Sequence, residues 1–108
     1  MEDKYVIKAL AALAQPNRLQ IFRSLVVKGR EGVMPAQLAE ALSMPANTLS
    51  FHLKELMQAD LISQERNGRN LIYRAQFDRM NAVLTYLSQN CCQGDACEVS
   101  PEAICKTC

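Results

Sequence analysis

The stretch that decides the fold is residues 46–75, ANTLSFHLKELMQADLISQERNGRNLIYRA. In its first half, Leu49, Leu53 and Leu56 recur at the spacing of one helical face. Apolar residues repeating at this period indicate an amphipathic α-helix. The pattern therefore predicts a helix over residues 46–59.

The second half of this stretch predicts a β-hairpin. Two strand-like runs, residues 61–66 and 70–75, flank the pair Asn67-Gly68. An Asn-Gly pair between two such runs is a strong hairpin signal, because a type I′ turn needs positive φ at both central residues. We therefore expect two antiparallel strands joined by a type I′ turn.

Helices are predicted on both sides of this stretch, over residues 4–14, 17–28, 35–42 and 76–89. Pro16 separates the first two, and Pro35 begins the third, because proline suits a first helical turn. Ser43–Pro45 forms a short turn before the next helix, which is typical of a helix-turn-helix. The order of elements predicts an α+β fold that is mainly α, a winged helix-turn-helix with a two-stranded hairpin wing.

The composition is that of one globular domain. The chain has 108 residues, of which 49% are hydrophobic and 21% charged. No run approaches the ~20 apolar residues that a membrane helix needs, and the acidic start, Met1–Lys4, lacks the apolar region of a signal peptide. We expect a cytoplasmic protein without a membrane partner, with residues 1–92 as the domain and residues 93–108 as an irregular tail.

Charge and cysteine are unevenly distributed along the chain. Residues 1–90 carry 11 Lys and Arg against 8 Asp and Glu, whereas residues 91–108 carry one Lys against 3 acidic residues. The mildly basic body is compatible with DNA binding. All five cysteines lie in the last 18 residues, at Cys91, Cys92, Cys97, Cys105 and Cys108. In a reducing cytoplasm, such a cluster indicates metal or redox chemistry rather than a disulfide framework.

The predicted helix at 46–59 has a polar side opposite its leucines. Asn47, Phe51, Lys54 and Gln58 project there, and Ser50 and Glu55 flank them. Amide side chains can contact adenine bidentately, and an exposed aromatic ring can pack on thymine methyl groups, so this side suits a DNA major groove. The alternative is an ordinary amphipathic helix whose polar side is only solvated.

His52 and the hairpin tip point to DNA less directly. His52 is the only histidine and lies at the edge of the apolar stripe, so a partly buried core residue is the alternative to a DNA contact. At the tip, Arg66 and Arg69 are placed to reach phosphates or a narrow minor groove. The alternative there is solubilising charge, but a hairpin directly after a helix-turn-helix favours DNA binding.

Three segments resemble the ArsR/SmtB family of repressors, and they occur in the family's order. They are Leu13–Ile21 (LAQPNRLQI), Ser50–Leu56 (SFHLKEL) and Glu65–Arg74 (ERNGRNLIYR), similar to the family's opening motif, its SxHLxxL recognition helix and its wing. The resemblance spans roughly residues 8–90. It implies a homodimer through the first and last helices, with two recognition helices that read an inverted repeat in operator DNA.

The resemblance also implies which side chains contact DNA, since Asn47, Ser50 and His52 match polar positions of the family motif. Together with the outward side of the helix and the hairpin tip, it gives a full set of expected contacts. These are Asn47, Thr48, Ser50, Phe51, His52 and Lys54 on the helix, and Arg66 and Arg69 on the wing.

The chain departs from the family pattern in three places. Residues 35–40 lack the Cys-Val-Cys site of the best-known arsenic sensors, and the last helix has Asp78 but none of the histidines that zinc sensors carry there. Asp60 replaces the glycine that is common after the recognition helix. The effector site is therefore expected in the tail, where Cys91-Cys92 resembles a sub-group that senses As(III) just past the final helix.

Cys91, Cys92 and Cys97 bring three thiols together, two at the helix exit and one across a four-residue loop. As(III) is a soft, pyramidal, three-coordinate centre, so three thiolates complete it, whereas structural zinc takes four ligands. We expect As(III) as the effector, with Sb(III) fitting equally and cadmium or lead as further candidates. Release of DNA would need a coupling free energy of only about 1–3 kcal/mol.

The terminal pair Cys105-x2-Cys108 keeps alternatives open. It is half of a zinc site, and with Cys97 or Cys92 it would build a four-thiolate zinc or cadmium site, either responsive or purely structural. Equally, Cys105 and Cys108 would serve only as auxiliary scavengers of ions, and thiol–disulfide sensing is another alternative. A cysteine-based enzyme of the arsenate reductase type is disfavoured, because a catalytic thiolate needs an electropositive pocket or helix N-terminus, and these cysteines follow a helix C-terminus in an acidic tail.

Overall fold

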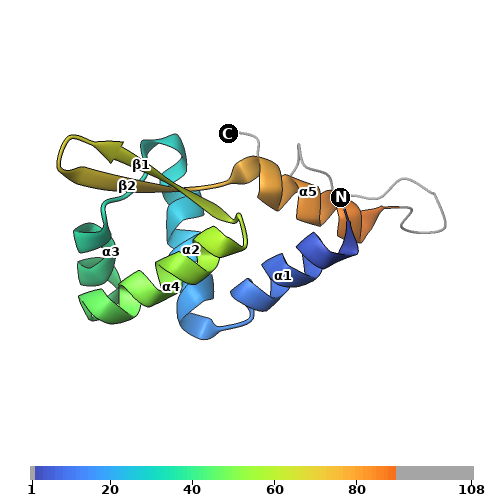
Figure 1. Ribbon diagram of the computed structural model, residues 1–108, viewed down its shortest axis with the longest axis horizontal. Coiled ribbons are helices and arrows are strands. Elements are labelled where there is room, and N and C mark those ends of the chain that lie inside the picture. Colours follow the sequence, from blue (N-terminus) through green and yellow to red (C-terminus); the bar gives the residue numbers. More distant parts are fainter. Residues whose placement is uncertain (1, 90–108) are drawn as a thin grey trace.

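The computed structural model describes residues 2–89, which form five α-helices and one two-stranded sheet. The sheet lies at one end of the domain, and α1 and α5 extend toward the other (Figure 1). The elements are α1 (Asp3–Leu13), α2 (Pro16–Lys28), the short 3-10 helix η1 (Gly29–Glu31), α3 (Pro35–Leu42), α4 (Ala46–Gln58), β1 (Ile62–Asn67), β2 (Asn70–Ala75) and α5 (Phe77–Ser88). The predicted winged helix-turn-helix, α+β and mainly α, is confirmed. Within this part of the chain, no helix is long and apolar enough to span a membrane.

Local chemistry explains where the helices begin. At the start of α2, Pro16 occupies the first turn, and Gln15 Oε1 accepts a hydrogen bond from the backbone N–H of Arg18 at 2.8 Å. This bond satisfies one of the N–H groups that the first turn of a helix leaves free. α3 likewise begins at Pro35. It ends at Leu42, and the residue that follows, Ser43, has a φ of 51° that turns the chain toward α4.

The core is built around the buried side of α4. Leu49, Leu53 and Leu56 are 1%, 2% and 0% exposed, and burial of one such side chain stabilises a fold by about 1.5–3 kcal/mol. The cluster around them takes residues from all five α-helices and both strands, including Val6, Ile21, Leu25, Leu38, Leu61, Ile62, Tyr73 and Val83. The predicted inward stripe is therefore confirmed.

The hairpin forms where it was expected, but its turn differs. β1 and β2 are antiparallel, and their last pair is Asn67 with Asn70, which leaves Gly68 and Arg69 as the two loop residues. Of these two, only Gly68 has a positive φ, 67°. A glycine with positive φ at the first loop position is typical of a type II′ turn. The predicted type I′ turn is therefore wrong, because pairing of Asn67 moves the loop one residue along the chain.

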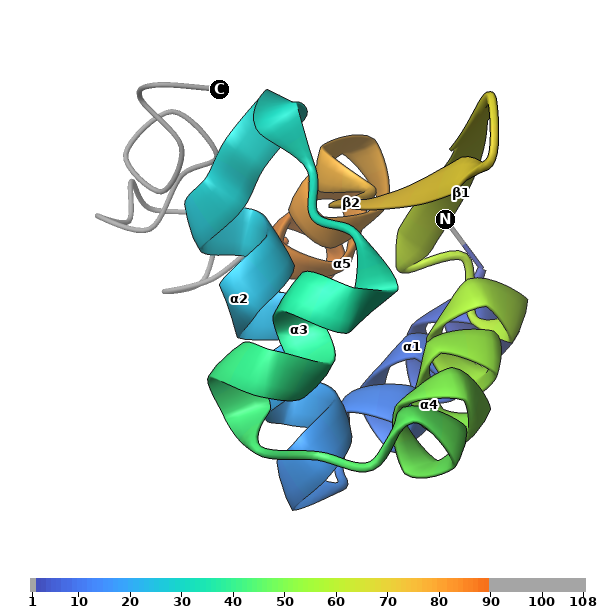
Figure 2. The same cartoon turned by 90° about the vertical axis from the view of Figure 1, so that its left-hand side faces the viewer.

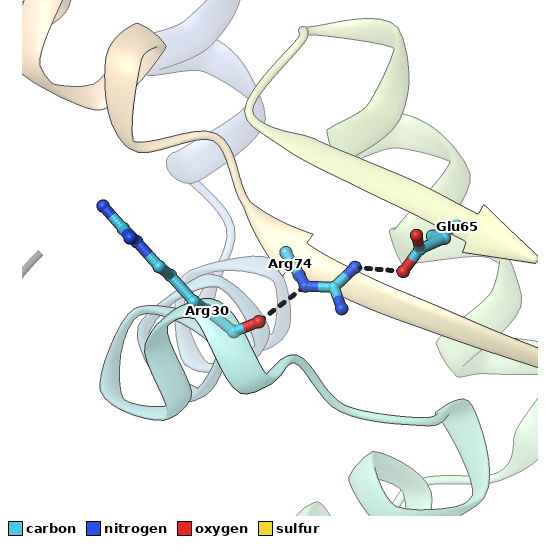
Figure 3. A network of polar contacts seen from close by, with 3 residues as sticks. All are labelled: Arg30, Glu65 and Arg74. Carbon is cyan, nitrogen blue, oxygen red and sulfur yellow. Dashed lines mark hydrogen bonds and ion pairs between the residues drawn. The ribbon is translucent and has the colours of Figure 1, made fainter. Parts of the chain in front are cut away.

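The hairpin is tied to the segment that follows α2. Val33 and Tyr73 exchange two backbone hydrogen bonds of 2.9 Å, which join this segment to β2. Arg74 adds a side-chain link, shown in Figure 3: its Nε donates to the Arg30 carbonyl at 2.7 Å, and its Nη1 lies 2.8 Å from Glu65 Oε1. The wing is thus held against the body of the domain by contacts distant in sequence.

α1 and α5 lie side by side, away from the hairpin (Figure 1). The Tyr86 hydroxyl in the last turn of α5 donates a hydrogen bond to the Asp3 carboxylate at the start of α1. The Arg79 guanidinium of α5 lies 5.6 Å from the centre of the Tyr5 ring, a cation–π distance. These contacts join the first and last helices of the described chain.

His52 lies on the buried side of α4 and is 7% exposed. Its Nδ1 has no hydrogen-bond partner within residues 2–89. Burial lowers the pKa of His52 below its ordinary value of 6.5, the nearby positive charge of Arg18 lowers it further, and Glu55 opposes them. The folded state therefore favours the neutral imidazole.

Gly32 provides a test of how tightly the hairpin packs on the body. A Cβ at this position would lie 2.5 Å from Ile72 Cγ2, and φ is +75°. We expect Gly32→Ala to lower the free energy of unfolding by about 2–4 kcal/mol, through backbone strain and overpacking. Gly29→Ala is the control, since φ is +66° there but no atom lies within 4 Å. Urea denaturation should show a clearly smaller loss for Gly29→Ala, and equal losses would contradict the close contact.

His52 provides a second test, through pH. Because its pKa is lower in the folded than in the unfolded state, the unfolded chain takes up a proton first as pH falls below 6.5. We expect the urea midpoint of the wild-type protein to fall between about pH 7.5 and about pH 5.5. His52→Gln should flatten the profile in this window, whatever its effect on stability at the higher pH. An unchanged slope would show that His52 does not titrate as its burial requires.

Candidate nucleic-acid interface

The outer side of α4 presents the polar residues that the helical period predicted. Asn47, Ser50, Phe51 and Lys54 are all exposed, opposite the leucine stripe. Phe51 is 57% exposed, which is unusual for an aromatic side chain. The structure thus brings an amide, a hydroxyl, an aromatic ring and a cation onto one side of a single helix.

The N-terminal turn of α4 carries two of the expected contacts. Asn47 Oδ1 accepts a hydrogen bond of 2.9 Å from the backbone N–H of Thr48. Asn47 Oδ1 is therefore engaged within the helix, and the NH2 group of the same exposed side chain remains as a hydrogen-bond donor for a partner. Thr48 is half-buried, so it presents less of its side chain than Asn47 or Ser50.

The wing carries the other expected contacts. Arg66 and Arg69 are exposed at the end of the hairpin, and neither forms an ion pair with residues 2–89. Arg74 differs, because its guanidinium is held by Glu65 and by the Arg30 carbonyl. Two of the wing's three arginines are thus available to a phosphate backbone.

A hollow of about 480 Å³ separates α4 from the hairpin. Its lining includes Ser50 and Lys54, together with Met57, Gln58, Gln64 and Tyr73. Gln64 Nε2 donates to the Tyr73 hydroxyl at 3.3 Å across the strand pair, which places an exposed amide beside the helix. Gln64 is not among the contacts expected from the sequence, because it joins this surface only through the position of the hairpin beside α4.

His52 lies apart from this surface. The other helix candidates face outward, whereas His52 is buried with the leucines beneath them. Its ring meets that of Phe51 edge-on, with ring centres 5.4 Å apart. Its burial matches the alternative interpretation from the sequence, a partly buried core histidine, and its ring packs against Phe51.

The predicted effector ligands Cys91, Cys92 and Cys97, and the pair Cys105 and Cys108, lie outside the described residues. Within residues 2–89 there is no group of three or more His, Cys, Asp or Glu side chains able to hold a metal ion. The three departures from the family pattern, at residues 35–40, at Asp60 and on the last helix with Asp78, lie within residues 2–89.

Asp60 follows α4 with a φ of 60°, the conformation for which glycine is usual. Arg79 lies 3.7 Å from its carboxylate, a contact that a glycine would lack. The aspartate is therefore accommodated at the end of α4 by a partner on α5.

Comparison with known proteins supports the DNA-binding fold. A helix-turn-helix domain family matches residues 13–65. The arsenical resistance operon repressor of Bacillus subtilis is 33% identical over 92 residues, which cover 80% of this chain and 84% of that protein. The regulator YdfF of Bacillus subtilis is 39% identical over 72% of this chain, and NmtR of Mycobacterium tuberculosis is 38% identical over 63% of it. The chain spans 34% of the length of YdfF and 54% of that of NmtR.

Solved structures show the same architecture. An ArsR-like transcriptional regulator from Rhodococcus sp. RHA1 superposes with a TM-score of 0.71 at 26% identity, covering 80% of this chain and 78% of that one. The homodimeric winged helix-turn-helix domain Mb0332 from Mycobacterium bovis has a TM-score of 0.64 at 23% identity, covering 92% and 97%, and supports the fold alone.

The relatives are transcriptional regulators, so the enzyme alternative raised by the cysteines is excluded and the chain is not an enzyme. The helix-turn-helix family match at residues 13–65 contains the first two of the three motifs that suggested a family, Leu13–Ile21 and Ser50–Leu56. An identity of 33% along 84% of a repressor's length establishes the relationship. The chain belongs to the ArsR/SmtB family of transcriptional regulators.

Proposed function

We propose that the chain is a repressor that binds operator DNA as a homodimer in the cytoplasm and is released when As(III) binds Cys91, Cys92 and Cys97. The observation that carries the DNA-binding part is the exposed polar side of α4 beside an arginine-tipped wing. Family membership supports it, because the relatives are repressors and regulators by name.

In this proposal α4 enters the major groove of the operator and the wing follows the backbone. Asn47, Thr48, Ser50 and Phe51 lie in the N-terminal half of the helix, the part that meets base edges in helix-turn-helix proteins. Lys54 lies one turn further along, and Arg66 and Arg69 supply cations for phosphates. His52 is proposed to act indirectly, by supporting the outer side of the helix.

The dimer is proposed to form through α1 and α5. Of the large apolar side chains that the described chain exposes, four lie on these two helices: Tyr5, Ile7, Leu10 and Leu87. Ile7 is 66% exposed and Leu87 56%. A second copy would cover apolar side chains on these two helices, and two recognition helices related by a two-fold axis would match an inverted repeat.

As(III) is proposed as the effector because of the donor set. Three thiolates satisfy a pyramidal As(III) centre without a fourth ligand, and Sb(III) has the same requirement. The name of the arsenical resistance operon repressor supports this choice. The name of NmtR, which is matched over a shorter part of the chain, does not mention arsenic. A zinc or cadmium site that adds Cys105 and Cys108 is the second candidate, since these supply the sulfurs for a tetrahedron.

The described contacts link the end of α5, which precedes the proposed ligands in the sequence, to the helices that support α4. Cys91 follows the end of α5 at Ser88 by three residues, and the last turn of α5 is bonded to α1 through Tyr86 and Asp3. α1 packs against α4, and Arg18 Nε donates to the carbonyl of Ala12 at the end of α1 at 2.7 Å. An ion that changes how α5 ends would thus act on the helices that support α4.

Substitutions on the two DNA-contacting elements should differ in kind. Arg69→Ala should weaken binding to all DNA and reduce the slope of log K against log salt by about 1.8, because each of the two protomers loses one phosphate contact worth about 0.9. Asn47→Ala or Ser50→Ala should instead lower the affinity for operator DNA relative to that for random DNA. The loss of discrimination should be about 1–3 kcal/mol for each base contact removed. Fluorescence anisotropy with labelled duplexes at several salt concentrations measures both quantities.

Lys8→Ala is the control for this experiment, because it removes the same charge from an exposed position on α1. Its salt slope should match that of the wild-type protein. Equal behaviour of Lys8→Ala and Arg69→Ala would mean that the wing makes no phosphate contact.

Substitutions in the tail should separate the three proposed ligands from the terminal pair. Cys97→Ser should leave operator affinity intact but abolish or sharply reduce release by As(III), because a pyramidal site then lacks one thiolate. Cys105→Ser with Cys108→Ser should release DNA as the wild-type protein does. The assay is operator anisotropy titrated with As(III), Sb(III), Cd(II) and Zn(II) under reducing conditions. Full release from Cys97→Ser, or none from the double variant, favours the four-thiolate site instead.

A further inference from the structure

A groove between α2 and α3 lies outside the proposed DNA surface and outside the α1–α5 surface. The two helices lie side by side in Figures 1 and 2, and the groove has a volume of about 470 Å³. Its floor and rim include the apolar Val27, Val33, Leu38 and Ala41 and the cations Arg23 and Lys28. No carboxylate lines it.

The α2 side of the groove is apolar and positive at once. Val27 is 81% exposed, the highest value among the large apolar side chains of the described residues. Arg23 precedes it by one helical turn, and Lys28 follows it directly. Neither cation forms an ion pair with any residue between 2 and 89. An occupant that matches this surface combines carboxylates with apolar side chains.

The tail of this chain contains such a segment. Glu98–Ile104 reads EVSPEAI, with carboxylates at Glu98 and Glu102 and apolar side chains at Val99 and Ile104. It carries no Lys or Arg and accounts for two of the three acidic residues that follow residue 90. Its charge and apolar content are therefore complementary to those of the groove.

The connection to the domain is long enough for this contact. An extended chain spans at most about 3.3–3.6 Å per residue, so the nine steps from Gln89 to Glu98 reach about 30 Å and the fifteen to Ile104 about 50 Å. The largest dimension of the molecule is 49 Å. Ile104 can thus reach any part of the described domain, and Glu98 any part within about 30 Å of Gln89.

We infer that Glu98–Ile104 docks in the groove between α2 and α3, with its carboxylates at Arg23 and Lys28 and its apolar side chains on Val27. The contact does not depend on the identity of the ion or of the operator. It connects the residues directly after Cys97 to α3, the first helix of the helix-turn-helix, and it removes the exposed Val27 from water.

The test is the backbone {1H}-15N NOE of Glu98–Ile104 in the full-length protein, reduced and free of metal. We expect values in the wild-type protein close to those of the helices, because a docked segment tumbles with the domain. Arg23→Glu with Lys28→Glu should lower them to those of a free chain end. Adding Glu98→Lys and Glu102→Lys to that variant should restore them, since the charges are then exchanged.

The matched control is Lys8→Glu with Arg69→Glu, which makes the same change in net charge on exposed cations outside the groove. It should leave the NOE values of the segment unchanged. Low values in the wild-type protein, or equal losses in the groove and control variants, overturn the inference. So does a groove variant that loses affinity for DNA while the segment keeps its NOE values, because Arg23 and Lys28 would then serve a phosphate backbone.

Discussion

Burial of the leucine stripe of α4 is the constraint on which the rest of the structure depends. Leu49, Leu53 and Leu56 face α1, α2, α3 and β1 at the centre of the core. A rotation of α4 by a single residue, about 100°, would turn Ser50 and Lys54 toward this core, where an unpaired polar group is costly. Burial of the leucine stripe thus determines which side of α4 faces solvent. The outer residues can be selected for a partner, because substitutions at exposed positions usually change stability little.

The elements could be predicted because each is encoded locally. Helical period, proline at helix starts and an Asn-Gly pair between strands all act over a few residues, and the helices appear within one residue of their expected bounds. The turn type could not be predicted in the same way. The local preference of Asn67-Gly68 competes with a register that also satisfies the pairing of Tyr73 with Val33 and the contact of Arg74 with Arg30. These partners lie some forty residues apart, and local patterns carry no information about them.

The positions of some candidate site residues could likewise be predicted from the sequence, and those of others could not. The exposed positions of Asn47, Ser50, Phe51 and Lys54 follow directly from the helical period, whereas His52 lies at the border of the stripe, where a period of 3.6 residues does not separate inside from outside. Its burial depends on what packs against that border. Gln64 was missed because it belongs to the surface only through the placing of the hairpin beside α4. The cysteine ligands lie beyond the described residues and stay a prediction.

The bond between Tyr86 and Asp3 also has a consequence for how the protein can be engineered. It places the first turn of α1 against the last turn of α5, so the two ends of the described domain are neighbours. Chains whose ends are close tolerate circular permutation well, with new ends opened at an exposed loop. An affinity tag fused directly before Asp3 would crowd the point where the chain leaves α5 toward its cysteines. A fluorescent reporter for ion binding is therefore better inserted at the hairpin tip for titrations without DNA, and a purification tag better separated from α1 by a flexible linker.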